Sequence, residues 1–126
     1  MTMPDDTLYD RVGGRDFFVT LIERFYGSVA DDPVLRPLYP EDLGPPKAHL
    51  AGFLAQYWGG PPQYTAERGP PRLRMRHAPF AIGQMERDVW VRHMRAALGS
   101  VDVSPEDAAA LSEYFEDTAT FLINRP

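Results

Sequence analysis

Apolar residues that recur every three or four positions constrain the fold of this chain more than any other feature. Such residues mark one helical stripe within residues 15–30, and two later stretches, residues 83–98 and about 104–123, show the same spacing. No stretch alternates apolar and polar residues as a half-buried strand would. The sequence therefore predicts an all-α fold. The expected buried positions are Phe18, Leu21, Ile22, Phe25 and Val29, then Met85, Val89, Trp90, Met94 and Leu98, and finally Leu111, Tyr114, Phe115, Thr118, Ala119 and Leu122.

Proline and glycine residues set the boundaries between these helices. A fourth main helix is predicted from Pro45 and Pro46, which suit a first turn, to the glycine pair at Gly59 and Gly60. Ser104 is a predicted N-cap. Short helical pieces are expected at residues 33–38 and 71–76, and residues 63–71 are predicted to be a loop.

Length and composition exclude several classes of protein. The 126 residues suit a single domain, residues 1–126, with residues 1–11 as a flexible or short helical arm. Because the chain has no cysteine, disulfides, thiol catalysis and thiolate-bound metals are excluded. The formal net charge of −5 argues against nucleic-acid binding. No apolar segment is long enough to span a membrane and no export signal is evident, so a cytoplasmic location is expected.

Residues 72–80 carry the clearest chemical signal. Three arginines alternate with apolar residues and lead into His77, which is followed by Pro79, and proline disfavours helical geometry at the preceding residue, Ala78. A histidine on the last turn of a helix can ligate a metal through one ring nitrogen while the other donates to a carbonyl one turn back, near Leu73. The neighbouring cations suit acidic groups, so the combination points to haem. The competing interpretation is a solvated basic helix end with an ordinary surface histidine.

Seven segments in this order, spread over residues 8–124, resemble the group II truncated haemoglobins. They are Arg24-Phe25-Tyr26, Val34-Leu35, residues 39–42, Phe53-Leu54, residues 56–61, residues 72–80 and residues 86–90. The resemblance implies a two-over-two α-helical sandwich around haem b, with hinges at the glycine pairs 13–14 and 59–60. Two positions depart from the family pattern. Pro46 stands where the group often has alanine or threonine at the distal haem edge, and His49 stands where a relative often has an arginine aimed at a haem propionate.

The same resemblance implies roles for individual residues. His77 matches the proximal iron ligand, while Tyr26, Tyr39 and Trp90 match distal residues that contact a bound gas. For each of the three, packing alone is the competing interpretation. The expected haem contacts besides His77 and Trp90 are Leu50, Phe53, Leu54, Met75, Phe80, Met94 and Phe115, with Arg72, Arg76 and His49 as partners for the propionates.

The predicted function is reversible binding of O2 and of other diatomic ligands, CO and NO, with slow O2 release caused by distal hydrogen bonds. A haem redox enzyme, either a nitric oxide dioxygenase or a peroxidase-like protein, is the alternative; it uses the same residues and needs an unidentified reductase. A cofactor-free helical interaction domain is the second alternative. The sequence leaves open whether the protein is an enzyme and whether it forms a homodimer.

Overall fold

The computed structural model describes residues 7–126, and every regular element in this range is helical, so the predicted all-α class is confirmed. Residues 1–6 of the predicted N-terminal arm lie outside the described residues. No helix in the described range is both long and apolar enough to cross a membrane. The elements are α1 (Leu8–Arg11), α2 (Arg15–Val29), the 3-10 turn η1 (Arg36–Leu38), α3 (Gly44–Tyr57), α4 (Gln63–Arg68), α5 (Leu73–His77), α6 (Gln84–Gly99) and α7 (Pro105–Phe121).

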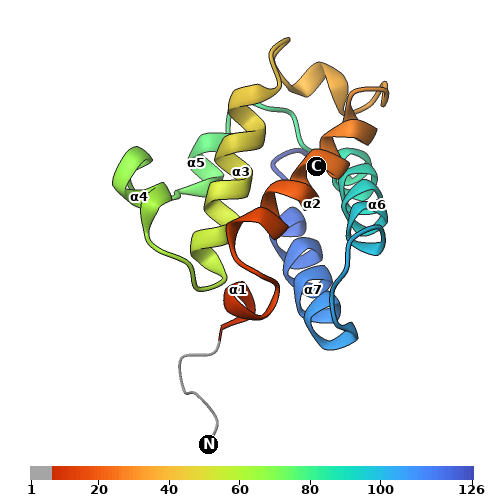
Figure 1. Ribbon diagram of the computed structural model, residues 1–126. Helices are drawn as coiled ribbons and strands as arrows, with labels where there is room; N and C mark the ends of the chain where they lie inside the picture. The colour runs from red at the N-terminus through yellow and green to blue at the C-terminus, as the bar shows by residue number, and fades with distance from the viewer. Residues whose placement is uncertain (1–6) are drawn as a thin grey trace, which may run out of the picture.

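The four long helices form two antiparallel pairs. Helix α2 packs against α3, α6 packs against α7, and α2 also crosses α6 to join the pairs (Figure 1). This is the two-over-two arrangement that the resemblance predicted. The short helices α4 and α5 lie outside α3, on the side away from α6 and α7.

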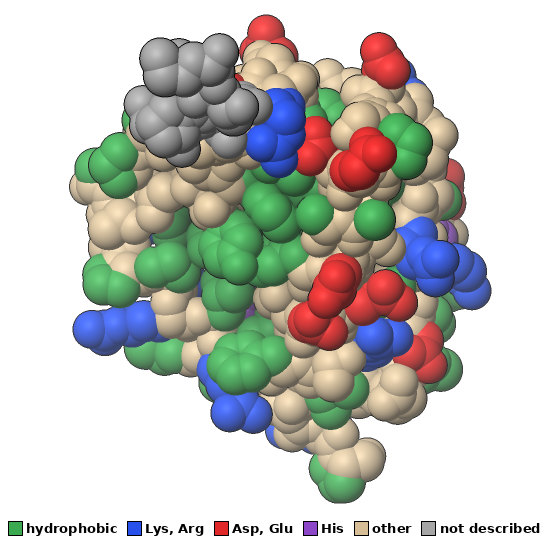
Figure 2. All heavy atoms as spheres, turned by 90° about the horizontal axis from the view of Figure 1, so that it is seen from below, with side chains coloured by type: hydrophobic (Ala, Val, Ile, Leu, Met, Phe, Trp, Pro, Cys, Tyr) green, Lys and Arg blue, Asp and Glu red, His purple; other side chains and the backbone are tan. Residues whose placement is uncertain are grey.

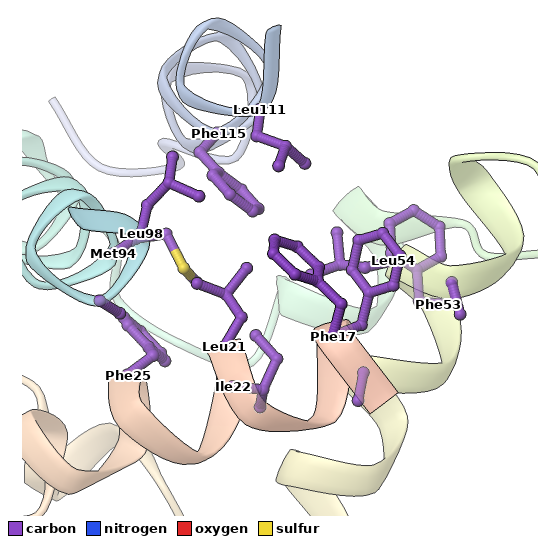
Figure 3. Packing of buried hydrophobic residues seen from close by; sticks show 14 of the residues in the cluster. Phe17, Leu21, Ile22, Phe25, Phe53, Leu54, Met94, Leu98, Leu111 and Phe115 are labelled. Atoms are coloured by element: carbon purple, nitrogen blue, oxygen red, sulfur yellow. The ribbon is translucent and has the colours of Figure 1, made fainter. Parts of the chain in front are cut away.

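The core forms where the two pairs meet, and all four long helices contribute large apolar side chains to it (Figure 3). Phe18, Phe25 and Phe115 are almost completely buried. Burial of each such side chain stabilises the fold by roughly 1.5–3 kcal/mol relative to exposure. Met85 departs from the prediction because it is 60% exposed. It lies nine residues before the buried Met94, and at about 100° per residue this places it on the opposite side of α6.

The glycine pair after α3 allows the chain to turn tightly against α1. Gly59 has φ +115°, and a Cβ there would lie 2.5 Å from the Cβ of Thr7. A Cβ on Gly60 would lie 2.7 Å from the carbonyl oxygen of Ala55. Glycine is therefore required sterically at both positions. The turn also brings the amide of Tyr9 to the carbonyl of Trp58, at 3.0 Å.

The predicted loop at residues 63–71 is wrong in its first part, because Gln63–Arg68 form helix α4. Helix α4 is held in place by hydrogen bonds to a side chain of α3. The Gln56 amide oxygen accepts from the Thr65 amide at 2.8 Å, and the Gln56 amide nitrogen donates to the Thr65 hydroxyl at 2.7 Å. A helix of 6 residues is too short to show periodicity and depends on such tertiary contacts.

Helix α5 ends at His77 as predicted, but for a different reason. Ala78 keeps helical dihedrals, φ −55° and ψ −36°, despite the proline that follows it. The helix ends because Pro79 has no N–H with which to continue the hydrogen-bond ladder to Met75. Instead, the Ala78 amide closes a tighter turn onto the Met75 carbonyl, at 3.3 Å.

Asp32, which is 8% exposed, links the end of α2 to α6. Its carboxylate accepts from the amides of Val34 and Leu35, at 2.8 and 3.0 Å, and lies 2.7 Å from Nε2 of His93. The hydrogen bond to His93, opposed in part by burial, holds the pKa of Asp32 below its ordinary value of 3.8. His93 thus makes a polar contact with Asp32.

We expect Asp32 to make the fold sensitive to acid. Its pKa is lower in the folded chain than in the unfolded one, so its contribution is present above pH 3.8 and is lost as the pH falls toward the lowered value. Chemical denaturation across pH 2–7 should show that Asp32→Asn lowers stability near neutrality and flattens the decline of stability below pH 3.8. Asp31→Asn, at the exposed neighbouring position, is the matched control. An acid decline that is equally steep in Asp32→Asn and wild type would contradict this assignment.

Candidate functional site

A cavity of about 430 Å³ opens between the helices. Its volume lies in the range of small-molecule and cofactor pockets, and its wall is mostly apolar. Helices α2 to α7 and the segments at residues 38–40 and 80–82 all contribute to it. The lining residues are Tyr26, Leu35, Leu38, Tyr39, Pro40, Pro46, His49, Leu50, Phe53, Leu54, Tyr64, Arg68, Leu73, Arg76, His77, Phe80, Ile82, Glu86, Arg87, Trp90, Tyr114, Phe115, Thr118, Ala119 and Leu122.

His77 lies half-buried in the wall of this cavity, and one of its ring nitrogens is engaged in a hydrogen bond to the backbone. Nδ1 is 2.7 Å from the carbonyl oxygen of Leu73, one turn back on α5. Because a carbonyl oxygen can only accept, Nδ1 carries the proton and donates it. When the ring is neutral, Nε2 is therefore left with a bare lone pair, and Nε2 has no hydrogen-bond partner within residues 7–126. A bare imidazole nitrogen oriented by its other nitrogen is the arrangement of a metal-binding histidine.

Asn124, near the C-terminus, holds the segment that follows His77 in place through hydrogen bonds. The side-chain amide of Asn124 donates to the carbonyls of His77 and Phe80, at 3.2 and 2.9 Å. Its oxygen accepts from the amide of Ile82 at 2.9 Å, and its own backbone amide donates to the Ile82 carbonyl at 2.8 Å. Residues 77–82 are therefore held at the cavity by the end of the chain, a contact that nothing in the sequence pattern indicated.

A cationic group lies on one part of the cavity wall. It consists of Arg68 from α4 and Arg76 from α5, and His49 from α3 also lines the cavity near them. Partial burial lowers the pKa of His49, and the charges of Arg68 and Arg76 lower it further. Arg76 also donates to the carbonyls of Pro71 and Arg68, at 2.7 and 2.8 Å, which fixes its guanidinium. A ligand with acidic groups would be attracted to this part of the wall.

Three aromatic residues with polar hydrogens, Tyr26, Tyr39 and Trp90, meet elsewhere on the wall. The rings of Tyr26 and Tyr39 are 5.3 Å apart and nearly perpendicular. Burial raises the pKa of Tyr26, and contact with the Tyr39 hydroxyl raises it further. Burial also raises the pKa of Tyr39, although hydrogen bonding from Trp90 and Tyr26 acts in the opposite direction. Both phenols therefore keep their protons at neutral pH and can donate hydrogen bonds.

Most of the residues predicted to contact a cofactor line the cavity, and three do not. Arg72 is exposed at the N-cap of α5, where it adopts left-handed dihedrals, φ 44° and ψ 56°. Met75 is 58% exposed, because it lies two residues from His77 and so on the far side of α5. Met94 is fully buried in the helical core and does not reach the cavity. The predicted residues at the cavity are Tyr26, Tyr39, His49, Leu50, Phe53, Leu54, Arg76, His77, Phe80, Trp90 and Phe115.

Sequence reasoning missed the contribution of α4. Tyr64, which is 7% exposed, and Arg68 both line the cavity from the stretch that was predicted to be a loop. Both Arg68 and Arg76 lie near the Tyr64 ring, with guanidinium carbons 5.8 and 6.0 Å from its centroid. The four-residue spacing between Tyr64 and Arg68 is the only local signal that could have placed them on one helix face.

The side chains at this cavity fit haem. The wall is mostly apolar, His77 offers one bare imidazole nitrogen, and cations stand where acidic groups could be bound. A cavity lined by Phe53, Leu54 and Phe115 would exclude water from a flat apolar ring.

Comparison with known proteins gives a consistent result. The sequence profile of the bacterial-like globins matches residues 7–124. The group 2 truncated hemoglobin YjbI of Bacillus subtilis is 38% identical over 112 residues, which cover 89% of this chain and 85% of that protein.

Solved structures agree with the sequence match. A thermostable hemoglobin from Thermobifida fusca superposes with a TM-score of 0.93 at 50% identity, covering 96% of this chain and 99% of that one. A truncated oxygen-avid haemoglobin from Bacillus subtilis superposes with a TM-score of 0.90 at 37% identity, covering 94% of this chain and 100% of that one.

Proposed function

This chain belongs to the bacterial-like globin family, and on that premise we propose that it binds O2, CO and NO reversibly at a haem b held by His77, with slow release of O2. Family membership implies a haem cofactor and the binding of small gas ligands such as O2. The identity of His77 as iron ligand, the type of haem and the slow release are the parts that we propose.

The observation that carries the proposal is the state of the His77 ring. Its Nδ1–H donates to the Leu73 carbonyl, which leaves Nε2 bare beside the cavity. Neither of the other two histidines offers this combination. His93 is engaged with Asp32 through Nε2, and within the described residues no hydrogen bond to a carbonyl orients the ring of His49 as Leu73 orients that of His77. His77 is therefore the histidine best prepared to bind iron.

When bound, haem would supply the iron that takes up a diatomic gas and shifts electron density onto it. Phe53, Leu54 and Phe115 would surround the ring with apolar surface. Arg68 and Arg76 would bind its acidic arms, since cations pair with carboxylates at a partly exposed site, and His49 would add a neutral hydrogen-bond donor.

The hydrogen-bond donors Tyr26, Tyr39 and Trp90 support slow O2 release. All three side chains carry a polar hydrogen at the cavity wall, and each can turn it toward a ligand held in the cavity. A ligand carrying partial negative charge accepts such donors strongly, whereas a less polar ligand does not. The Bacillus subtilis protein, which shares this fold, is described as oxygen-avid, and this supports the same property here.

The assignment of His77 is tested by His77→Gly. We expect this variant to lose most of its haem, or to hold it with a displaced Soret band, and we expect added imidazole to restore the wild-type spectrum. His49→Gln, which changes the other histidine of the cavity wall, should keep the Soret band in place. A normal spectrum in His77→Gly without imidazole would mean that another residue binds the iron.

The distal donors are tested by O2 release from Tyr26→Phe, Trp90→Phe and the double variant. A hydrogen bond to a charged group is worth roughly 1.5–3 kcal/mol. Since about 1.4 kcal/mol is tenfold, each loss should speed release by roughly ten- to a hundredfold. Tyr39→Phe, which removes the hydroxyl that the other two contact, should have a comparable effect.

Stopped-flow displacement of O2 by CO measures these rates, and CO dissociation is the internal control. Because CO carries less negative charge when bound, its release should change much less than that of O2. The effects of Tyr26 and Trp90 need not add, because both act on the same group. Wild-type O2 release in all of these variants would show that the three side chains only pack.

A further inference from the structure

The loop between α2 and α3, residues 30–43, brings Tyr39 to the cavity wall and lies at the top of the molecule in Figure 1. The regular element that it contains is the three-residue turn η1. Asp32 ties the first part of the loop to α6 through His93. Tyr39 comes directly after η1, where the chain becomes extended, with φ −112° and ψ 154°. The support of the chain beyond η1 therefore determines where the phenol of Tyr39 lies.

The side chain of Arg36, the first residue of η1, supplies that support. Its Nη1 donates to the carbonyl oxygens of Tyr39 and Pro40, at 3.2 and 3.0 Å, and its Nη2 donates to that of Glu41, at 3.0 Å. Among the described residues these three carbonyls have no other hydrogen-bond donor. No carboxylate of residues 7–126 lies within ion-pair distance of Arg36. The half-buried guanidinium therefore binds the backbone of the loop and no acidic side chain.

The chemistry of arginine and proline suits this arrangement. A guanidinium is planar and carries several N–H donors in fixed directions, so it can hold consecutive carbonyls in one geometry. Pro40 has no N–H, so its carbonyl is the one backbone group by which a hydrogen bond can hold it. Proline also favours extended geometry at the preceding residue, which agrees with the dihedrals of Tyr39. Together, Arg36 and Pro40 fix the backbone at Tyr39.

Tyr39 stands where its position affects the other donors of the cavity. Its ring lies 5.3 Å from that of Tyr26, and its hydroxyl interacts with the Tyr26 hydroxyl and the Trp90 indole. A hydrogen bond weakens steeply as its distance and angle depart from their preferred values. A small displacement of the Tyr39 backbone therefore changes how well these donors can reach a ligand in the cavity.

We propose that Arg36 is a positioning residue, which sets the place of the Tyr39 hydroxyl and thereby how strongly the cavity retains O2 relative to CO. Arg36 does not itself line the cavity and acts through Tyr39. The proposal rests on the proposed function in one respect, because haem must be bound and Tyr39 must face the gas. It adds a determinant of ligand selectivity that lies outside the cavity wall.

The other polar contacts of the loop do not hold residues 39–41. Asp32 binds the amides just before η1. Asp42 accepts from the amide of Gly44 at 2.9 Å, which supports the start of α3. Within the described residues, the guanidinium of Arg36 is therefore the side-chain group that fixes this part of the loop.

Amide hydrogen exchange on the purified full chain tests whether Arg36 holds the loop. Arg36→Met keeps a long unbranched side chain but removes every donor, so peptides that contain the Tyr39 amide should exchange faster than in the wild type. The new apolar side chain would lie at the top of Figure 1, remote from the apolar side chains that gather on the lower face (Figure 2), and so should not enlarge that patch. Arg24→Met is the matched control, because Arg24 donates to the Ser100 carbonyl at 2.8 Å elsewhere on the surface, and it should leave exchange at Tyr39 unchanged.

Ligand release tests whether this support affects the gas. Arg36→Met should release O2 roughly three- to tenfold faster than the wild type, because a displaced donor loses only part of its hydrogen bond. CO release should change little, so the ratio of the two rates reports the selectivity. Arg36→Lys keeps the charge and one point of donation, and its O2 release should fall between those of Arg36→Met and the wild type. In a Tyr39→Phe background, Arg36→Met should add nothing, because Arg36 acts through the Tyr39 hydroxyl.

The outcomes separate this inference from the proposed function. A chain that binds no haem, or a Tyr39→Phe variant that releases O2 at the wild-type rate, would overturn the role proposed for Tyr39 and this inference with it. Faster O2 release in Tyr39→Phe together with wild-type release in Arg36→Met would overturn this inference alone. Unchanged exchange at Tyr39 in Arg36→Met would do the same, as would an equal acceleration by Arg36→Met with and without the Tyr39 hydroxyl, because Arg36 would then act elsewhere.

Discussion

The hydrogen bond from His77 to the Leu73 carbonyl is the interaction on which the chemistry of this protein depends. It selects the ring tautomer and leaves Nε2 as a lone pair beside the cavity. Helix α5 contains only 5 residues and needs outside support to hold this geometry. Arg76 ties it to the end of α4, and Asn124 ties the following segment to the C-terminus. The site is thus assembled from short elements that are fixed to the longer helices.

The cavity also bears on the stability of the fold. The apolar core lies where the two helix pairs meet, yet a hollow of about 430 Å³ remains beside it. An unfilled apolar hollow lacks the dispersion contacts that a packed core would make. A ligand that binds only the folded chain contributes its binding free energy to stability. Haem is accordingly expected to complete the core as well as to bind the gas.

Periodicity and breaker residues predicted the four long helices, because each buries a wide apolar stripe. The segment at residues 72–80 predicted the hydrogen bond of His77 to Leu73, because that contact is local. The incorrect predictions concern features that do not follow from local sequence patterns. Helix α4 depends on Gln56 from another helix, and Arg72 and Met75 point away because a five-residue helix does not reveal its phase in the sequence. A single sequence displays neither the tertiary contact that supports α4 nor the phase of a helix as short as α5.

Titration of the apoprotein with haem, with Soret absorbance and melting temperature recorded on the same samples, tests the central claim most directly. The account predicts saturation at one haem per chain. A ligand at about a thousand times its dissociation constant adds about 4 kcal/mol of stability, so the melting temperature should rise by roughly 10–20 °C in a chain of this size. Absorbance that keeps rising beyond one equivalent, with an unchanged melting temperature, would show that haem adheres to the surface and does not fill the cavity.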